Sequence, residues 1–128
     1  MIYLTVEDVL AVAARHGAVP RDLGLVQAAV ARPQASAFGE DAYGRLNEKA
    51  AAFLHSMATN QAFVDGNKRV AWDSTVLFLR LNEASLHAPT QDAYGFMVSL
   101  DHHSDWRAIA RTLLGWTDLG SPGQRDRS

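Results

Sequence analysis

The stretch NKRVAWDSTVLFLRLN, residues 67 to 82, decides the fold that this sequence predicts. The run VLFLRL alone would allow a buried strand, but it continues a helix-forming stretch, which favours a helix. Apolar side chains lie on nearly all sides of that helix, at Val70, Ala71, Val76, Leu77, Phe78, Leu79 and Leu81. A helix that is apolar on most sides usually lies at the centre of a bundle. We therefore predict that this helix is the central one of a helical domain.

The rest of the chain also shows helical periodicity. Further helices are predicted between Thr5 and Gly17 and over residues 24–33, 45–59, 90–100 and 104–115. Thr5 followed by Asp8 is a loose capping signal, and Ser104 is expected to cap the last helix. No convincing strand or internal repeat is present in the sequence. We predict an all-α fold of about six helices in one domain, residues 1–117, followed by a disordered polar tail, residues 118–128.

The composition restricts the class of protein. A chain of 128 residues supports one domain with a single core. The formal net charge of −2 at pH 7 gives no global bias toward nucleic acid or an anionic membrane. The sequence has no cysteine, which excludes disulfides and thiolate metal sites. It also has no apolar run of membrane-spanning length and no signal-peptide pattern. We expect a soluble cytoplasmic protein that binds neither nucleic acid directly nor a membrane.

The residues that lead into the central helix, NQAFVDGNKR at positions 60 to 69, carry the candidate chemistry. They place an acid, a glycine, an amide and two cations side by side, at Asp65, Gly66, Asn67, Lys68 and Arg69. The first N–H groups of a helix have no partner within it and attract anions. Gly66 lets phosphate oxygens approach those groups closely, Arg69 adds a forked donor, and Lys68 adds a compact positive charge. The pattern predicts a phosphate site at the start of the helix.

Three residues complete the predicted site. Asp65 is placed to hold Mg²⁺, a hard cation that bridges carboxylate and phosphate oxygens. Asn67 is expected either to hold the loop or to contact a nucleotide, and Phe63 is expected to anchor the loop in the core. A capped helix start with a solvated basic face would carry the same residues without any ligand.

The motif FVDGNKR, residues 63 to 69, resembles the Fic motif in its death-on-curing (Doc) version. That motif reads His-x-Phe-x-[Asp/Asn/Glu]-[Gly/Ala]-Asn-Lys-Arg, and every position from the Phe onward is matched. The stretch RDLGLVQAAVARPQ, residues 21 to 34, is similar to an upstream stretch of Doc-like proteins, and residues 76 to 82 resemble the helix after the motif. Together the similarities cover most of residues 4–116. They imply the compact all-α bundle of the Fic fold, in agreement with the periodicity.

The resemblance also implies an activity. Fic enzymes that transfer AMP usually have Gly at the position of Lys68 and a second Arg at the position of Trp72. A Lys at the first position implies that the terminal phosphoryl group of ATP is transferred instead, with Mg²⁺ as cofactor. Doc-type toxins act in this way as protein kinases on a threonine of elongation factor Tu and arrest translation. AMP transfer remains an alternative, favoured by Gly66, Asn67 and Arg69 but weakened by Lys68 and Trp72.

The chain departs from the family pattern at Gln61, where the family has the His that deprotonates the target hydroxyl. A carboxamide can orient a hydroxyl but has no basicity to accept its proton. Losing a general base typically costs about a hundred- to ten-thousand-fold in rate. We therefore expect transfer by this chain to be weak or absent. Deliberate replacement and natural degeneration would both explain the glutamine.

The resemblance further implies a small antitoxin whose C-terminal helix binds in an apolar groove near the active site. A second reading, from another class, is a nucleotide- or antitoxin-binding module without catalysis. Both readings predict nucleotide binding, whereas only the first predicts that transfer recovers in Gln61→His.

Residues outside the motif receive structural interpretations. Asp73 lies one turn beyond Arg69, so an ion pair between them is expected, with a site-shaping role as the alternative. Arg21 and Asp22 are expected to brace the loop. The histidines, among them His55, lack metal-ligand spacing and are expected to be structural or exposed.

Overall fold

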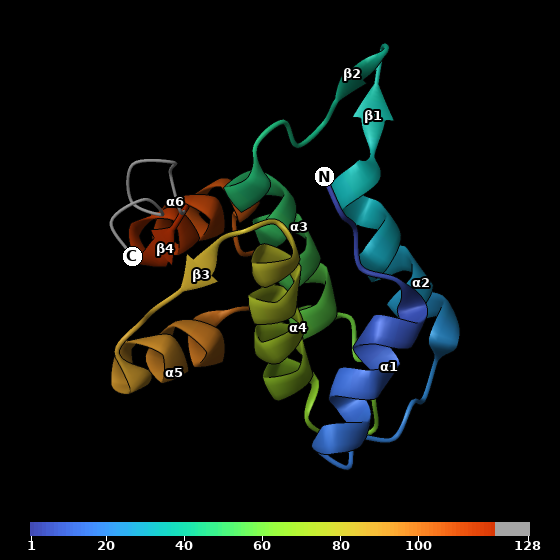
Figure 1. Ribbon diagram of the computed structural model, residues 1–128. Helices are drawn as coiled ribbons and strands as arrows, with labels where there is room; N and C mark the ends of the chain where they lie inside the picture. The colour runs from blue at the N-terminus through green and yellow to red at the C-terminus, as the bar shows by residue number, and fades with distance from the viewer. Residues whose placement is uncertain (120–128) are drawn as a thin grey trace.

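A computed structural model describes residues 1–119, which fold as six α-helices arranged around a central pair (Figure 1). This confirms the predicted all-α bundle. The helices are α1 (Val6–Arg15), α2 (Leu23–Ala31), α3 (Leu46–Thr59), α4 (Asn67–Leu81), α5 (Thr90–Ser99) and α6 (Trp106–Trp116). A short 3₁₀ helix, η1 (Arg32–Gln34), continues α2. No helix within residues 1–119 combines the length and the apolar character that crossing a membrane requires.

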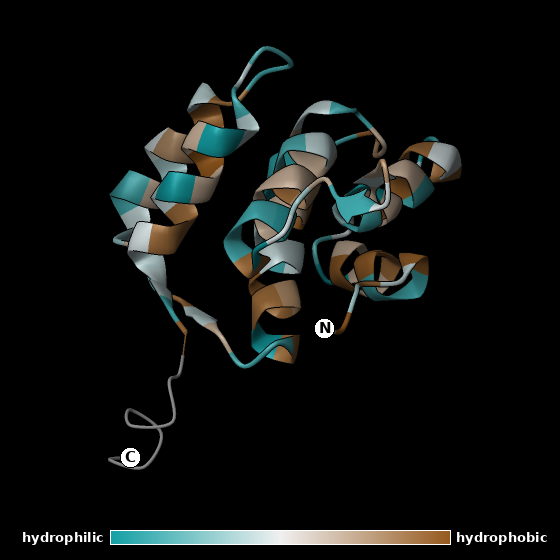
Figure 2. Ribbon diagram, turned by 90° about the horizontal axis from the view of Figure 1, so that it is seen from above, coloured by the Kyte–Doolittle hydropathy of each residue, from teal (hydrophilic) through white to brown (hydrophobic). Residues whose placement is uncertain are grey.

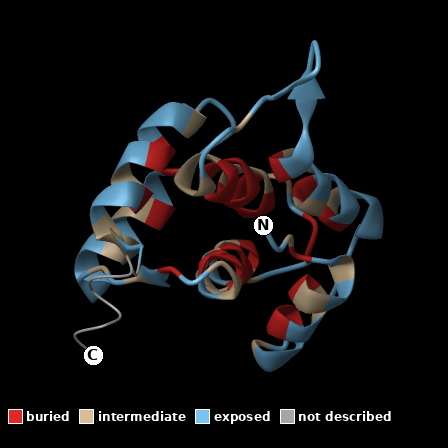
Figure 3. Ribbon diagram, turned by 45° about the horizontal axis from the view of Figure 1, so that its top comes forward, coloured by how far each residue is buried: buried red, intermediate tan, exposed pale blue. Residues whose placement is uncertain are grey.

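The central pair consists of α3 and α4, which carry most of the buried residues in Figure 3. On α3 the run Ala50–Ala51–Ala52 is fully buried beside Phe53 and Leu54, and these small side chains let neighbouring helices approach closely. On α4 the buried apolar residues are Val70, Ala71, Phe78 and Leu79. The prediction that residues 67–82 form the central helix is confirmed, with the helix ending at Leu81.

The remaining helices flank this pair on two sides. In Figure 1, α1 and α2 lie on one side and α5 and α6 on the other. Figure 2 shows hydrophobic and hydrophilic residues alternating along these helices, and the buried ones, such as Val12 on α1 and Leu113 on α6, belong to the core. Helix α5 is the least buried of them, since Met97 is its single buried residue. The end of α1 and the start of α4 meet at the same end of the bundle (Figure 1).

Within residues 1–119, four two-residue strands correct the prediction that the chain contains no convincing strand. A hairpin pairs β1 (Ser36–Ala37) with β2 (Glu40–Asp41), and a second pair joins β3 (Ser85–Leu86) to β4 (Thr117–Asp118). Pairs this short show no alternating pattern in a sequence. Asp118, assigned to the tail by the sequence, thus pairs with Ser85, and the tail from residue 120 onward lies outside the described residues.

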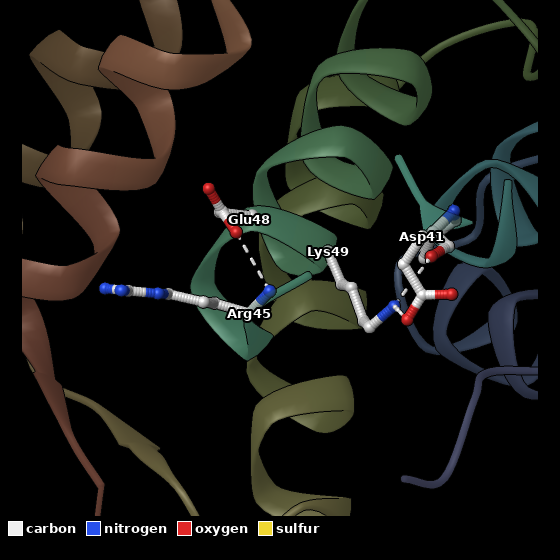
Figure 4. Close-up of polar contacts among 5 residues, drawn as sticks. Asp41, Arg45, Glu48 and Lys49 are labelled. Atoms are coloured by element: carbon white, nitrogen blue, oxygen red, sulfur yellow. Dashed lines mark hydrogen bonds and ion pairs between the residues drawn. The ribbon is translucent and has the colours of Figure 1, made fainter. Parts of the chain in front are cut away.

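The hairpin β1–β2 projects from the end of the bundle opposite the start of α4 (Figure 1). Figure 4 shows how it is tied to α3. The ammonium group of the buried Lys49 lies 3.6 Å from an Asp41 carboxylate oxygen and donates to the carbonyl of Pro33 at 3.3 Å. At the start of α3 the Glu48 carboxylate accepts a hydrogen bond from the Arg45 N–H at 2.9 Å. The Lys49–Asp41 contact ties the hairpin to α3, at the end of the bundle opposite the candidate site.

The helix caps were predicted in part. Thr5 and Asp8 form the expected reciprocal capping box of α1, with distances of 3.1 and 2.9 Å. The prediction that Ser104 caps the last helix was wrong. Asp105 caps α6 by accepting from the Arg107 N–H at 2.9 Å, while the Ser104 hydroxyl accepts from the Asp101 N–H in the preceding turn.

Candidate functional site

A cleft of about 890 Å³ opens at the start of α4. One wall comes from the end of α1 and the residues after it, His16, Gly17 and Ala18. The floor comes from the loop before α4 and the first turns of α4, including Gln61, Val64, Asp65, Gly66, Asn67, Lys68, Arg69 and Trp72. The opposite wall comes from the segment before α5 and from α5 itself, including Leu86, Ala93, Tyr94, Met97 and Val98. The cleft is therefore charged along its floor and apolar along the α5 wall.

The start of α4 presents unpaired backbone donors to this cleft. Gly66 precedes the helix with φ 79° and ψ 17°, a left-handed conformation that glycine adopts without the cost that a Cβ imposes. No side chain caps this end of α4. Within residues 1–119, the N–H groups of Asn67, Lys68 and Arg69 have no hydrogen-bond partner. Three convergent N–H groups at a positive helix end form a potential anion site.

The loop before α4 is held by the chain segment after α1. The Val64 N–H donates to the Val19 carbonyl at 2.9 Å, and the N–H groups of Arg21 and Asp22 donate to the Ala62 carbonyl at 2.8 and 3.0 Å. Phe63, between these contacts, is 1% exposed and packs in the core, as predicted. These hydrogen bonds and the buried Phe63 side chain anchor the loop to the bundle.

Arg21 braces the loop at Gln61, as predicted. Its guanidinium donates to the Gln61 carbonyl from Nε at 3.0 Å and also from Nη2. Gln61 has φ 61°, a left-handed conformation that costs a residue with a Cβ roughly 1–2 kcal/mol. The two guanidinium contacts stabilise that backbone. The Asp22 side chain has a different role and caps α2 by accepting from the N–H groups of Gly24 and Leu25.

Asn67 holds the loop from the other side. Its Oδ1 accepts from the Phe63 N–H at 2.9 Å, and its Nδ2 donates to the Phe63 carbonyl at 2.9 Å. A longer contact of 3.4 Å joins Nδ2 to Oε1 of Gln61. Of the two roles considered for this side chain, the structure shows the loop-holding one. Its backbone N–H remains available to an anion.

Asp65 lies exposed at the mouth of the cleft. One carboxylate oxygen, Oδ1, accepts from the Gly66 N–H at 2.7 Å, and Oδ2 has no hydrogen-bond partner within the described residues. These residues contain no cluster of three or more His, Cys, Asp or Glu side chains that could hold a metal ion without a ligand. A single free carboxylate fits Mg²⁺ that is completed by phosphate oxygens and water, the usual way in which proteins bind this ion.

The two cations of the motif differ in their contacts. The Lys68 ammonium group donates to the carbonyls of Val98 and Leu100 at 3.2 and 3.3 Å, at the end of α5. Arg69 is exposed and makes no hydrogen bond or ion pair within residues 1–119. The predicted ion pair between Arg69 and Asp73 was wrong, because Asp73 contacts His16 at 2.6 Å instead. The Arg69 guanidinium is consequently free to bind an anion.

Sequence reasoning missed the α1 and α5 walls of the cleft. Helix periodicity placed α5 correctly but gave no sign that Tyr94 and Val98 would border the motif. His16 was likewise unremarkable in the sequence, and only Gly17, at φ 65°, marked the turn that brings it to the cleft. By contrast His55 is structural, as expected, since its ring nitrogens contact the Arg32 guanidinium and the Asp101 carbonyl.

The chain is similar in sequence to known proteins over most of its length. The sequence model of the Fic/DOC family matches residues 3–79 of the chain, which include the loop and nearly all of α4. A protein of Mycolicibacterium smegmatis named Toxin Doc is 53% identical over 129 aligned residues, covering 94% of this chain and 98% of the relative.

Proposed function

This chain belongs to the Fic/DOC family as a Doc-type toxin, and from that membership we propose that it transfers the terminal phosphoryl group of ATP to a protein hydroxyl. One observation carries the proposal. The uncapped start of α4 directs three free N–H groups into a cleft of about 890 Å³, with the free Arg69 guanidinium beside them. This arrangement can bind the charged end of a nucleotide.

Asp65 would hold Mg²⁺ against the phosphate oxygens, and the ion would supply charge neutralisation during transfer. The N–H groups of Asn67, Lys68 and Arg69 would fix the phosphate chain. Positioning and electrostatic stabilisation account for most of the catalysis in phosphoryl transfer. A preformed row of backbone N–H donors would supply both.

Lys68 favours phosphoryl transfer over AMP transfer. Its side chain reaches across to the end of α5, where it donates to two carbonyl groups. The lysine stem therefore fills space that a glycine, usual in AMP-transferring members, would leave open to the nucleotide. Trp72, in place of a second Arg, also removes a phosphate ligand, so AMP transfer is the less favoured activity.

Gln61 limits the proposed activity. It lies on the cleft beside the phosphate site, at the position of the family base, and cannot accept a proton near neutral pH. We expect nucleotide binding with weak transfer. A binding module without catalysis is the second candidate, and Gln61 is the observation that favours it.

The proposed protein substrate is elongation factor Tu, modified at a threonine in the cytoplasm. The proposed partner is a small antitoxin whose helix packs on the apolar α5 wall. There Tyr94 is 72% exposed and Val98 is 55% exposed, which provides apolar surface beside the site.

The proposal is tested by restoring the base. Gln61→His should raise phosphate transfer from terminally labelled ATP to elongation factor Tu by about a hundredfold or more, and it should arrest growth on expression. Gln61→Asn is the matched control, since it keeps an amide. Mass spectrometry of the product distinguishes phosphate from AMP. A folded Gln61→His protein that binds ATP but transfers no phosphate would refute the proposed enzymatic activity. The protein would then be a nucleotide-binding module without catalysis.

A further inference from the structure

An imidazole outside the family motif, that of His16, lines the same cleft as Gln61. His16 lies directly after α1, and its Nε2 contacts Oδ2 of Asp73, on α4, at 2.6 Å. The side chains of His16 and Asp73 are 23% and 41% exposed, so the pair is partly shielded, and His16 lines the cleft. Ala18, two residues further on, lies beside Gly66, which brings this turn close to the start of α4.

The contact with Asp73 selects the tautomer of the His16 ring. A carboxylate at Nε2 places the ring proton on Nε2 and leaves the lone pair of Nδ1 available. Nδ1 has no hydrogen-bond partner within residues 1–119. An imidazole that a carboxylate holds in one orientation and tautomer is a recurrent proton acceptor in enzymes.

We propose that His16, oriented by Asp73, accepts the proton of the target hydroxyl in this chain. The inference rests on the proposed phosphoryl transfer and assigns to it a base that the family motif does not contain. Asp73 contacts His16 directly, and the charged residues that line the same cleft are Asp65, Lys68 and Arg69.

The reaction step balances with these groups alone. The hydroxyl proton moves to Nδ1 of His16, and the oxygen forms a bond to the terminal phosphorus of ATP. The bond from that phosphorus to its bridging oxygen breaks, and the electron pair leaves with ADP. Asp73 stabilises the imidazolium that forms, through its contact with Nε2.

A purely structural role is the competing explanation, because the contact also joins α1 to α4. The two roles predict different patterns when His16→Gln is made in the native chain and again in the Gln61→His chain. If His16 is the base, its loss should lower the transfer rate most in the native chain, where residue 61 cannot accept a proton. If the His16–Asp73 contact is only structural, its loss should lower the rate equally in the native and Gln61→His chains. Glutamine is chosen because its amide can still donate to Asp73 while it lacks a basic nitrogen.

The measurement is phosphate transfer from terminally labelled ATP to elongation factor Tu by the full chain. His16→Gln should lower the rate about a hundredfold in the native chain and less than about tenfold in the Gln61→His chain. Asp73→Asn should lower the native rate in the same direction. His102→Gln, at an exposed position in the turn after α5, is the matched control and should leave the rate unchanged.

Each other outcome overturns the inference. Equal losses in both backgrounds would make His16 structural. A native chain that transfers nothing while Gln61→His is active would remove His16 as a base and leave the proposed function intact. If neither protein transfers phosphate although both stay folded, the proposed function itself fails.

Discussion

The Asn67 side chain is the point at which loop stability and ligand binding can be tested together. Its amide forms two hydrogen bonds of 2.9 Å to the backbone N–H and carbonyl of Phe63, which is 1% exposed. Asn67→Ala would remove both partners and leave two buried backbone groups unpaired. The substitution should therefore destabilise the fold and disorganise the turn that presents the helix donors.

The expected loss follows from the burial of these groups. Each buried backbone group left without a partner costs about 1–3 kcal/mol. Since water from the cleft can reach part of the loop, we expect about 2–4 kcal/mol in total for Asn67→Ala. For a chain of this length, that corresponds to a fall in Tm of roughly 6 to 20 °C.

Asn82 provides a matched control at the other end of α4. Its Oδ1 accepts from the Ile2 N–H and its Nδ2 donates to the Ile2 carbonyl, both at 2.8 Å. Asn82→Ala therefore removes an equivalent pair of bonds to an exposed residue, Ile2, together with one bond to the Phe78 carbonyl, and it does so far from the cleft. Urea unfolding and ATP titration should be measured on both variants. Both should lose stability, Asn82→Ala less, and only Asn67→Ala should lose ATP affinity, by about tenfold or more.

The reasoning would be refuted if Asn67→Ala unfolded at the native urea midpoint or bound ATP as tightly as the native chain does. Asn67→Asp gives a finer test, because aspartate keeps the acceptor for the Phe63 N–H and lacks the donor for its carbonyl. It should lie between the native chain and Asn67→Ala in stability.

Two further predictions concern the loop and the hairpin. Gly66→Ala should cost about 1–2 kcal/mol in urea unfolding, because φ 79° strains a residue with a Cβ while the space for the methyl group is adequate. A much larger loss would indicate a clash instead of strain. Lys49→Met should change the free energy of unfolding by less than about 1 kcal/mol, since it removes a buried ammonium whose partner Asp41 is 65% exposed and stays hydrated. A loss above about 3 kcal/mol would show that the buried charge stabilises the hairpin.

Helix positions could be predicted because the spacing of apolar residues within each helix indicates which side is buried. Apolar residues lie on nearly all sides of α4, so its central place in the bundle follows from pattern alone, whereas the central place of α3 was not predicted. Capping was less predictable where two competent residues are adjacent. Ser104 and Asp105 can both cap a helix. Asp105 caps α6 because the Ser104 hydroxyl already accepts from the Asp101 N–H in the preceding turn, and no sequence pattern indicates that turn.

The site could be predicted only where its residues are contiguous. Gln61 and residues 64–69 lie together in the sequence and in the cleft, whereas the α1 and α5 walls come from distant segments. Spacing on one helix suggested that Arg69 pairs with Asp73. The fold instead brings His16, 57 residues away in the chain, to the same carboxylate at 2.6 Å. Local spacing cannot report a partner that only tertiary packing supplies.

The loop keeps its shape without help from the side chain of residue 61. Arg21 holds the Gln61 carbonyl, and Asn67 holds Phe63, so the constraints act on backbone atoms. The Gln61 side chain adds one contact of 3.4 Å and is exposed. Gln61→His should therefore change the free energy of unfolding by no more than about 0.5 kcal/mol, as at other exposed positions, while it introduces a basic nitrogen. A larger shift in the urea midpoint would mean that residue 61 shapes the loop. Within that limit, any change in transfer on this substitution reports the chemistry of the base.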